Sequence, residues 1–344
     1  MYTFEEVFSF DHLKQSALEC LKGVRWKQSS QMFEINLLQW LSTLHKELLD
    51  GTYKSKGFTN FTISERGKLR NISSVHISER CVQKCLVTYA LRPLIVPRLI
   101  HDNCATVKGR GTDFAIKRLR EHLRYHLARY GRAGGILTMD YHNYFASIPH
   151  YRMIEKVAQL ILDNRLLNLL AYFIECFPGS YGLGLGSEIS QLCAVYYCNN
   201  VDHYFKDKLG VHGYGRYMDD SYLICEDLDK LKQYRDLFIE VSRSEGLEVN
   251  ETVTQITPFD GSHFTYLKKR IFITDDNKII MRLARKNITR RRRSIVKQNG
   301  LIAQGKMTPA EQHQSFVSWR GYANNYNSYN SANNLESMLY YNLC

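Results

Sequence analysis

Apolar residues recur every three or four positions over several separate stretches of the chain, and this spacing predicts amphipathic helices. Four leucines follow it between Met32 and Leu49, and Gly51 just beyond them marks a helix end. A helix that starts at Cys81 is expected to stop before Pro93, because proline breaks a helix interior. Further helices are predicted over residues 113–130, 153–173, 187–205 and 228–245, followed by a helical C-terminal region.

Only a few short segments have the alternation or the apolar runs that are typical of strands. Residues 53–75 predict a β-hairpin, and residues 136–139 predict a short buried strand. Residues 214–225 predict two strands joined by a turn at Asp219-Asp220, and three more strand-like pieces follow. Few strands separated by helical blocks of unequal length indicate an α+β fold instead of a regular βαβ alternation.

The composition is that of an ordinary globular protein. The 344 residues suggest about two domains, and 44% hydrophobic with 23% charged residues excludes disordered and fibrous classes. No apolar run approaches the roughly 18 residues of a membrane span, so no membrane association is expected. Nine scattered cysteines without a C-x-x-C pair, and opening residues without a basic secretory region, predict a cytoplasmic location.

Charge narrows the range of partners. Lysine and arginine exceed the acids, so that the net charge is +12. A surplus of this size favours a polyanionic partner such as a nucleic acid, although a basic surface alone does not identify one. The 23 tyrosines and 16 phenylalanines could stack on bases, but most of them are expected to fill the core.

Carboxylates stand at the ends of two predicted strands. Asp140 directly follows the apolar run 136–139, and Asp219 with Asp220 interrupts an otherwise apolar hairpin. Adjacent like charges repel each other, and a bound cation would remove that cost. Three carboxylates on one sheet edge would make an oxygen-rich site suited to Mg²⁺. The alternative interpretation is a solvated Asp-Asp turn.

These motifs resemble those of reverse transcriptases. Tyr217-Met-Asp-Asp220 matches the Y-x-D-D box of that family, and residues 137–150 resemble its first palm motif, in which an aromatic residue follows the aspartate by five positions. Residues 182–191 resemble the motif that supports nucleotide and template. Further segments resemble, in order, the family's fingers motifs and its later palm motifs: 68–72, 79–84, 108–115, 247–254 and 264–268.

The resemblance implies a right-hand polymerase fold with an antiparallel palm sheet. Its expected parts are an N-terminal helical extension (1–50), fingers (51–135), a palm (136–280, with helices over 151–180) and a helical thumb (281–344). The three glycines of 182–186 alone could also suggest a dinucleotide-binding loop, but no strand-and-helix unit surrounds them, so that interpretation is rejected.

The resemblance also assigns the metal site. Asp140 and Asp219 are the expected ligands, Asp220 adds charge, and the main chain of Tyr141 adds a carbonyl oxygen. Two Mg²⁺ ions are expected, with Mn²⁺ as a substitute.

Nucleotide binding is assigned by position. Phe145 stands where the family has its sugar gate, so deoxynucleotides would be selected; the alternative is a core phenylalanine. Lys68 and Arg70 on the predicted hairpin would grip the triphosphate, unless they serve solubility alone.

The sequence departs from the common family pattern. Leu185 stands where glutamine is usual and Gln191 where proline is usual, and this form resembles reverse transcriptases of diversity-generating retroelements and of bacterial defence. Residues 250–254 lack the lysine often found there, and Lys268 stands where the primer-grip motif often has glycine.

A basic segment follows the palm motifs. Residues 281–297 contain eight basic residues and no acids, and their place resembles the thumb that tracks the duplex backbone; a solvated basic face is the alternative. With Lys268, the residues expected to bind nucleic acid are Arg285, Lys286, Arg290, Arg291, Arg292 and Arg293.

The resemblance therefore implies an RNA-directed DNA polymerase that acts on dNTPs, an RNA template and a DNA product. A non-coding RNA partner is expected, in antiphage defence or in a diversity-generating retroelement, and an accessory protein is a candidate partner. The alternatives are a catalytically degenerate RNA-binding scaffold and an RNA-dependent RNA polymerase; Phe145 argues against the latter.

Overall fold

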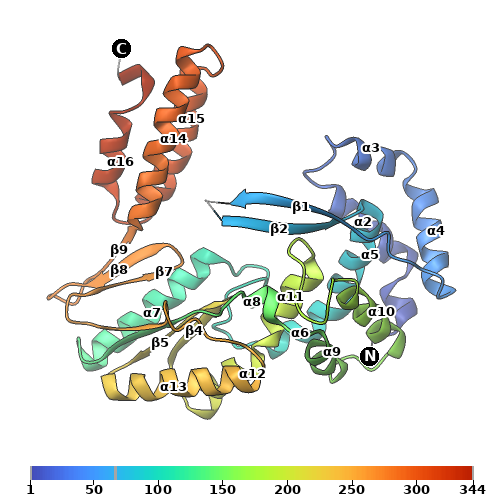
Figure 1. Cartoon of the computed structure of the whole chain (residues 1–344), viewed down its shortest axis with the longest axis horizontal. Coiled ribbons are helices and arrows are strands. Elements are labelled where there is room, and N and C mark those ends of the chain that lie inside the picture. Colours follow the sequence, from blue (N-terminus) through green and yellow to red (C-terminus); the bar gives the residue numbers. More distant parts are fainter. Residues whose placement is uncertain (1, 66–67, 343–344) are drawn as a thin grey trace.

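The computed structural model describes residues 2–65 and 68–342 (Figure 1). The chain begins with a group of helices packed around buried leucines and phenylalanines. Asn36 separates the last two of them, so the single helix predicted over 32–49 is wrong. Gly51 follows the group with a left-handed φ of 70°. The helices are α1 (Phe4–Val7), α2 (Phe10–Leu21), α3 (Gln28–Ile35) and α4 (Leu37–Leu49).

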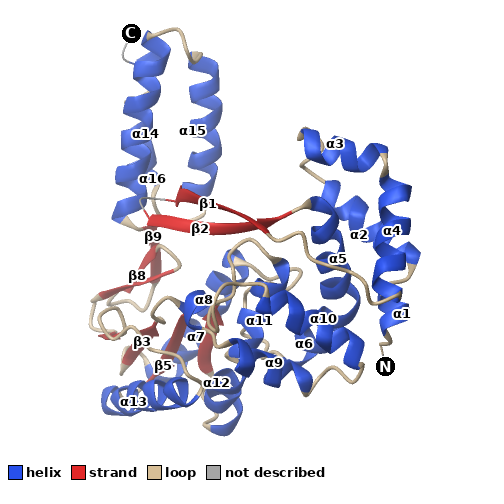
Figure 2. Cartoon of the chain, turned by 45° about the vertical axis from the view of Figure 1, so that its right-hand side comes forward, coloured by secondary structure: helices blue, strands red, loops and turns tan. Residues whose placement is uncertain are grey.

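The predicted hairpin is confirmed as β1 (Phe58–Glu65) and β2 (Lys68–Val75), paired antiparallel. It extends from the N-terminal helices toward the C-terminal ones in both views (Figures 1 and 2). Its strand residues Phe61 and Leu69 are 47% and 78% exposed, so the hairpin is not part of a packed sheet.

The helix after the hairpin does not stop before Pro93. It runs through α5 (Ile77–Leu86), a π-helical turn η1 (Val87–Leu91), α6 (Arg92–Ile95) and a 3₁₀ turn η2 (Val96–Arg98). Proline lacks the amide hydrogen that continues an α-helix. The amide of Arg92 donates to the carbonyl of Val87, and this wider turn carries the chain past the proline.

A four-stranded antiparallel sheet forms the centre, in the order β4 (Gly213–Tyr217), β5 (Asp220–Cys225), β3 (Gly135–Met139), β6 (Gln255–Pro258). Alternate residues of its strands enter different cores, because successive side chains point to opposite faces. Leu137 and Leu223 pack with α13 (Leu228–Ser244) and the helices before β4. Ile136 and Ile224 pack with α7 (Thr112–Tyr130) on the other face. The sheet is therefore buried on both sides, which explains its near-continuous apolar strands.

The chain between β3 and β4 is mainly helical, and neither of the two long helices predicted there is continuous. The predicted helix over 153–173 is interrupted, because Asp163 caps the N-terminus of a second helix by accepting from the amides of Arg165 and Leu166. The helix predicted over 187–205 is also divided into shorter elements. The elements are α8 (Tyr144–Ser147), α9 (His150–Ala158), α10 (Asn164–Glu175), α11 (Glu188–Tyr197), α12 (Asn199–His203) and the π-helical turn η3 (Tyr204–Lys208).

Four strands, β6 to β9, replace the three strand-like pieces predicted after residue 245. The last three of them form a separate three-stranded sheet that leads to the C-terminal helices. Its strands are β7 (His263–Tyr266), β8 (Lys269–Ile273) and β9 (Ile279–Leu283). The helices α14 (Arg285–Ala303), α15 (Pro309–Asn324) and α16 (Tyr329–Glu336), with a final turn η4 (Tyr340–Asn342), stand apart from the rest (Figure 1). Among the described helices, none combines the length and apolarity needed to cross a membrane.

Candidate active site

The three predicted carboxylates lie at one edge of the four-stranded sheet. Strand β3 ends at Met139, which pairs with Ser221 of β5, so the same register sets Asp140 across from Asp220. Tyr217 pairs with Asp220, and the tight turn between β4 and β5 consists of Met218 and Asp219. The antiparallel register thus brings Asp140 to a turn that lies far later in the chain.

This proximity has an electrostatic consequence. Burial, followed by the charges of Asp219 and Asp140, raises the pKa of Asp220 to about 7, while Lys268 acts to lower it. Mutual repulsion in an oxygen-rich cluster is the situation that a divalent cation relieves, so the donor chemistry fits Mg²⁺. Within residues 2–65 and 68–342, no three His, Cys, Asp or Glu side chains are gathered tightly enough to form a complete metal-binding group.

Backbone hydrogen bonds fix the chain around Asp140. The amide of Asn250 donates to the carbonyl of Asp140 (2.8 Å), and the amide of His142 donates to the carbonyl of Glu248 (2.8 Å). The ring of Tyr141 is buried, with its hydroxyl 3.1 Å from Ser242 Oγ. The predicted late palm motif over 247–254 therefore supports the end of β3 from the side.

Phe145 lies on the short helix α8, which begins a few residues after the end of β3. Its ring is half-buried and packs edge-on against Tyr144. The amide of Leu183 donates to the carbonyl of Phe145 (2.8 Å), and the amide of Gly182 donates to the carbonyl of Ile148 (2.9 Å). These two donors belong to the loop of residues 182–187, called here the glycine-rich loop. It therefore holds the backbone that carries Phe145.

The same loop contacts the hairpin at Ser73 and helix α5 at Gln83. The amide of Ser73 donates to the carbonyl of Leu185, and Ser187 Oγ donates to Gln83 Oε1 (3.0 Å). Leu185 is half-buried there, whereas Gln191 is exposed on α11. Arg70 is exposed on β2; the side chain of Lys68 lies outside the described part of the structure.

A cavity of about 550 Å³ lies where the loop between β7 and β8 meets α14 and α15. Arg291 forms part of its wall, with Nη1 donating to Ser315 Oγ (3.2 Å), while Nε and Nη2 are buried with no hydrogen-bond partner in the described structure. We call it the junction cavity; it is lined by Thr112, Leu267, Lys268, Lys269, Asn287, Arg290, Arg291, Ser294, Trp319 and Tyr322.

The junction cavity divides the predicted basic segment. Arg290, Arg291 and Lys268 line it, whereas Arg285, Lys286, Arg292 and Arg293 lie elsewhere on α14. It also includes Lys269, which no sequence motif singled out. The Lys269 ammonium lies 2.6 Å from the Tyr322 hydroxyl and 4.5 Å from the centre of the Tyr326 ring. No local spacing signals this contact, because the tyrosines are far from Lys269 in the sequence.

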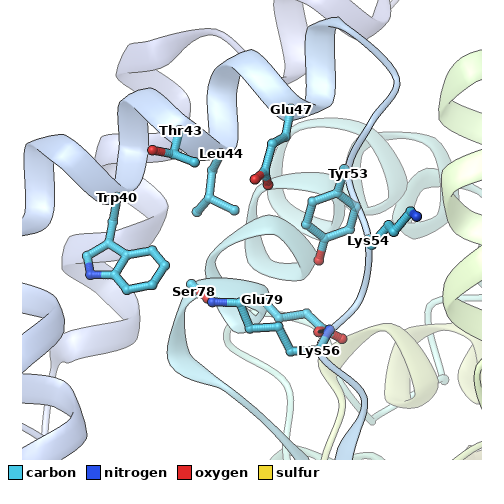
Figure 3. Close-up of a pocket in the computed structure, with 9 residues that line it drawn as sticks. All are labelled: Trp40, Thr43, Leu44, Glu47, Tyr53, Lys54, Lys56, Ser78 and Glu79. Carbon is cyan, nitrogen blue, oxygen red and sulfur yellow. Dashed lines mark hydrogen bonds between the residues drawn. The ribbon is translucent and has the colours of Figure 1, made fainter.

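A smaller pocket, of about 40 Å³, lies between α4, the segment before β1 and the start of α5 (Figure 3). The buried Glu79 carboxylate accepts from Ser55 Oγ (2.8 Å) and from the amide of Lys56 (2.9 Å). The Lys56 ammonium lies 4.3 Å from the Trp40 ring centre. These contacts attach the segment before β1 to α5 and to α4, and the pocket is too small for a nucleotide.

The family model described as reverse transcriptase (RNA-dependent DNA polymerase) matches residues 54–276. That range is more than half of the chain and contains the hairpin, Asp140, Asp219 and Asp220. The chain belongs to the reverse transcriptase family. The resemblance seen in the sequence motifs is thereby confirmed at the level of the family.

One sequence relative and one solved structure are informative. The retron Ec86 reverse transcriptase of Escherichia coli is 28% identical over 127 residues, which are 36% of this chain and 39% of that protein. Telomerase from Candida albicans, solved in complex with a TWJ fragment of telomeric RNA, matches with a TM-score of 0.51 and 11% identity over 75% of this chain and 50% of that chain. The structural match supports the predicted α+β right-hand polymerase fold. The chain spans half or less of each relative's length.

Proposed function

We propose that this chain is an RNA-directed DNA polymerase that extends a primer on an RNA template with dNTPs. The observation that carries the proposal is the meeting of Asp140, Asp219 and Asp220 at one sheet edge in a member of the reverse transcriptase family. We infer the subdomains accordingly: fingers over 51–135, a palm over 136–280, a thumb over 281–344 and an N-terminal helical extension.

In this proposal Asp140 and Asp219 would hold two Mg²⁺ ions, for which Mn²⁺ could substitute, and Asp220 would add negative charge and Tyr141 a main-chain oxygen. When bound, such ions activate the attacking hydroxyl and stabilise the leaving oxygen. The protein's own task is alignment, because phosphoryl transfer depends mainly on positioning and charge. The hydrogen bonds from Asn250 and His142 supply that rigidity at Asp140.

Substrate selection is assigned to the surroundings of Phe145. Its ring would exclude a 2′-hydroxyl, and the loop at Leu183 would hold it in place. Arg70, with Lys68, would grip the triphosphate, since a guanidinium matches phosphate geometry. Leu185 and Gln191 would support the nucleotide and template.

The nucleic acid is proposed to pass the junction cavity. Lys268, Arg290 and Arg291 present cations there, and Trp319 and Tyr322 present flat rings. The two unpartnered nitrogens of Arg291 could be satisfied by a phosphate. Arg285, Lys286, Arg292 and Arg293 would add longer-range attraction.

A dedicated non-coding RNA is the proposed template source, in antiphage defence or in a diversity-generating retroelement, with an accessory protein as a candidate partner. The relative from Escherichia coli is named as a retron reverse transcriptase.

The test is primer extension by the purified protein on primed RNA with Mg²⁺ and labelled dNTPs or NTPs. Asp219→Asn should lower incorporation by about 10³-fold or more and leave RNA binding intact. Asp236→Asn, at an exposed aspartate on α13, is the matched control. Incorporation of NTPs in place of dNTPs would support the RNA-polymerase alternative, RNA binding without incorporation would support the scaffold, and an active Asp219→Asn would overturn the metal assignment.

A further inference from the structure

An ion pair lies fully buried directly behind the Tyr217-Met-Asp-Asp220 turn. The guanidinium of Arg216 and the carboxylate of Asp202 have no exposed side-chain surface. Arg216 Nε and Nη2 donate to the two carboxylate oxygens at 2.7 and 2.6 Å, in a bidentate arrangement. The Tyr214 hydroxyl donates to the same carboxylate (2.8 Å). Apolar residues could replace such a buried pair at little or no cost in stability. Stability alone therefore does not explain why the pair is present.

The remaining donors of Arg216 point to that reason. Its Nη1 donates to the carbonyl oxygen of Met218 (2.9 Å), and its Nη2 also donates to the carbonyl of Val195 on α11 (2.8 Å). Arg216 thus connects the tight turn to the helices behind the sheet. Asp202 holds the guanidinium in the orientation that makes both contacts.

The hydrogen bond to Met218 acts on an unusual backbone. Met218 has a φ of 55°, in the left-handed region that side chains with a Cβ adopt at a cost. Because the peptide unit is planar, fixing the Met218 carbonyl also fixes the amide of Asp219. The direction in which the Asp219 side chain leaves the turn therefore depends on this contact.

The main chain of Arg216 is itself held. Its amide donates to the carbonyl of Asp102 (3.1 Å), and its carbonyl accepts from the amide of Cys104 (2.9 Å). Asp102 is buried and paired with Arg118 and Lys206, both at 2.6 Å. The support for the turn is therefore a chain of buried contacts that leads from α7 and η3 to Met218.

We propose that Arg216 is a positioning residue for the polymerase reaction, and that Asp202 acts by orienting it. The inference rests on the proposed role of Asp219 as a metal ligand. Arginine is required because its planar fork can serve a carboxylate and two carbonyls at once, whereas a lysine ammonium cannot span these acceptors.

Two variants test the proposal without leaving an unpaired buried charge. Arg216→Lys keeps a cation beside Asp202 but gives up the contact to Met218. Arg216→Met combined with Asp202→Asn removes both charges and keeps an oxygen acceptor for Tyr214. Lys156→Met combined with Glu245→Gln is the control, because it removes both charges of the Lys156–Glu245 pair, which is also largely buried but lies elsewhere (14% and 15% exposed).

The readouts are kcat and KM for dNTP, and Mn²⁺ binding to the protein without substrate, followed by electron paramagnetic resonance. Both Arg216 variants should fold, bind Mn²⁺ about 10-fold more weakly, and lose about 10- to 100-fold in kcat while KM stays near the parent value. The control should match the parent in all three quantities.

The inference is overturned if the folded variants keep the parent's kcat and Mn²⁺ affinity, or if neither folds, since Arg216 would then serve folding alone. Asp219→Asn measured in parallel separates this failure from that of the proposed function. If Asp219→Asn binds Mn²⁺ and incorporates dNTPs normally, the metal assignment itself is wrong; if only the Arg216 variants behave normally, the metal assignment stands and the positioning role is wrong.

Discussion

The backbone amide of Ser73 donates a hydrogen bond to the carbonyl oxygen of Leu185, at 3.0 Å. This contact joins strand β2 of the hairpin to the glycine-rich loop, which is distant from it in the sequence. Gly186 makes the approach possible: its φ is +116°, and a Cβ added there would lie 3.0 Å from the Ser73 carbonyl oxygen and 3.3 Å from Ile72 Cγ2. The hairpin that carries Arg70 is therefore held against the loop that carries Leu185.

Gly186→Ala should separate the hairpin from this loop. Backbone strain of about 1–2 kcal/mol together with the steric contact should raise KM for dNTP by up to about tenfold, because Arg70 moves with the hairpin, while kcat changes less. Steady-state primer extension measures both. Gly210→Ala is the matched control, since Gly210 also has a positive φ (65°) but has open space where the added methyl group would point; equal effects of the two variants would contradict the prediction.

Phe145→Ala should admit ribonucleotides. Removing the half-buried ring frees space next to the site where the sugar is proposed to lie, and the backbone stays held by Leu183. The ratio of kcat/KM for dNTP to that for NTP should fall by about 10-fold or more, and Phe145→Tyr should keep the parent ratio because it keeps the bulk. Competition between labelled dNTP and NTP measures this ratio. If Phe145→Ala still excludes NTPs, Phe145 is a core residue only.

The basic residues of α14 should act unequally. Arg290 and Arg291 line the junction cavity, whereas Arg292 and Arg293 do not. Arg290→Gln/Arg291→Gln should reduce the slope of log affinity against log salt by up to about 1.8 on a duplex, at about 0.9 for each phosphate contact. Arg292→Gln/Arg293→Gln should change it less. Binding to primed RNA between low and moderate salt, followed by fluorescence anisotropy, compares the pairs, and an equal effect would place the nucleic acid outside the cavity.

Asp220 should make stability depend on pH when no divalent cation is present. Its pKa in the folded chain, about 7, lies above its ordinary value of 3.8. The carboxyl therefore contributes stability below about pH 4, and that contribution is lost as the pH rises through 7. The difference corresponds to at most about 4 kcal/mol. Asp220→Asn should thus be more stable than the parent at pH 8 with EDTA and nearly equal to it at low pH.

Thermal unfolding at pH 4 and pH 8 measures this effect. Asp236→Asn serves as the control, because Asp236 is exposed and lies on α13. Adding Mg²⁺ should stabilise the parent more than Asp220→Asn at pH 8, because the cation offsets the repulsion among the carboxylates. If the difference in stability between the parent and Asp220→Asn does not change with pH, burial and the neighbouring carboxylates do not destabilise the ionised Asp220.

Most of the helices and strands were predictable from short-range features of the sequence. The hairpin, α7 and α13 agree with the sequence within a few residues, because glycines mark helix ends and periodicity is a short-range property. The predictions failed where apolar periodicity continued across a break, as at Asn36, or where a π-helical turn carried the chain past Pro93.

The candidate site was predictable only in part. Asp140, Asp219 and Asp220 stand at strand ends and within family motifs, so their sequence context identified them. The pairing of Arg216 with Asp202 has no local signature, because the two residues come from different elements and only the fold brings them together. Similarly, the run of four arginines does not tell which of them face the junction cavity, and Arg291 became distinct only through its contacts with α15.

The C-terminal helices have an apolar cluster of their own, formed by Ile295, Phe316, Leu335 and Leu339, separate from the two cores around the central sheet. A small separate core can open without disrupting the others. Backbone amides of α14–α16 should therefore exchange with deuterium sooner than those of β3 and β5, and a bound primer–template duplex should slow that exchange. The helices proposed to hold the duplex would then be the part of the free protein that opens most easily. Binding of the nucleic acid would stabilise them against opening.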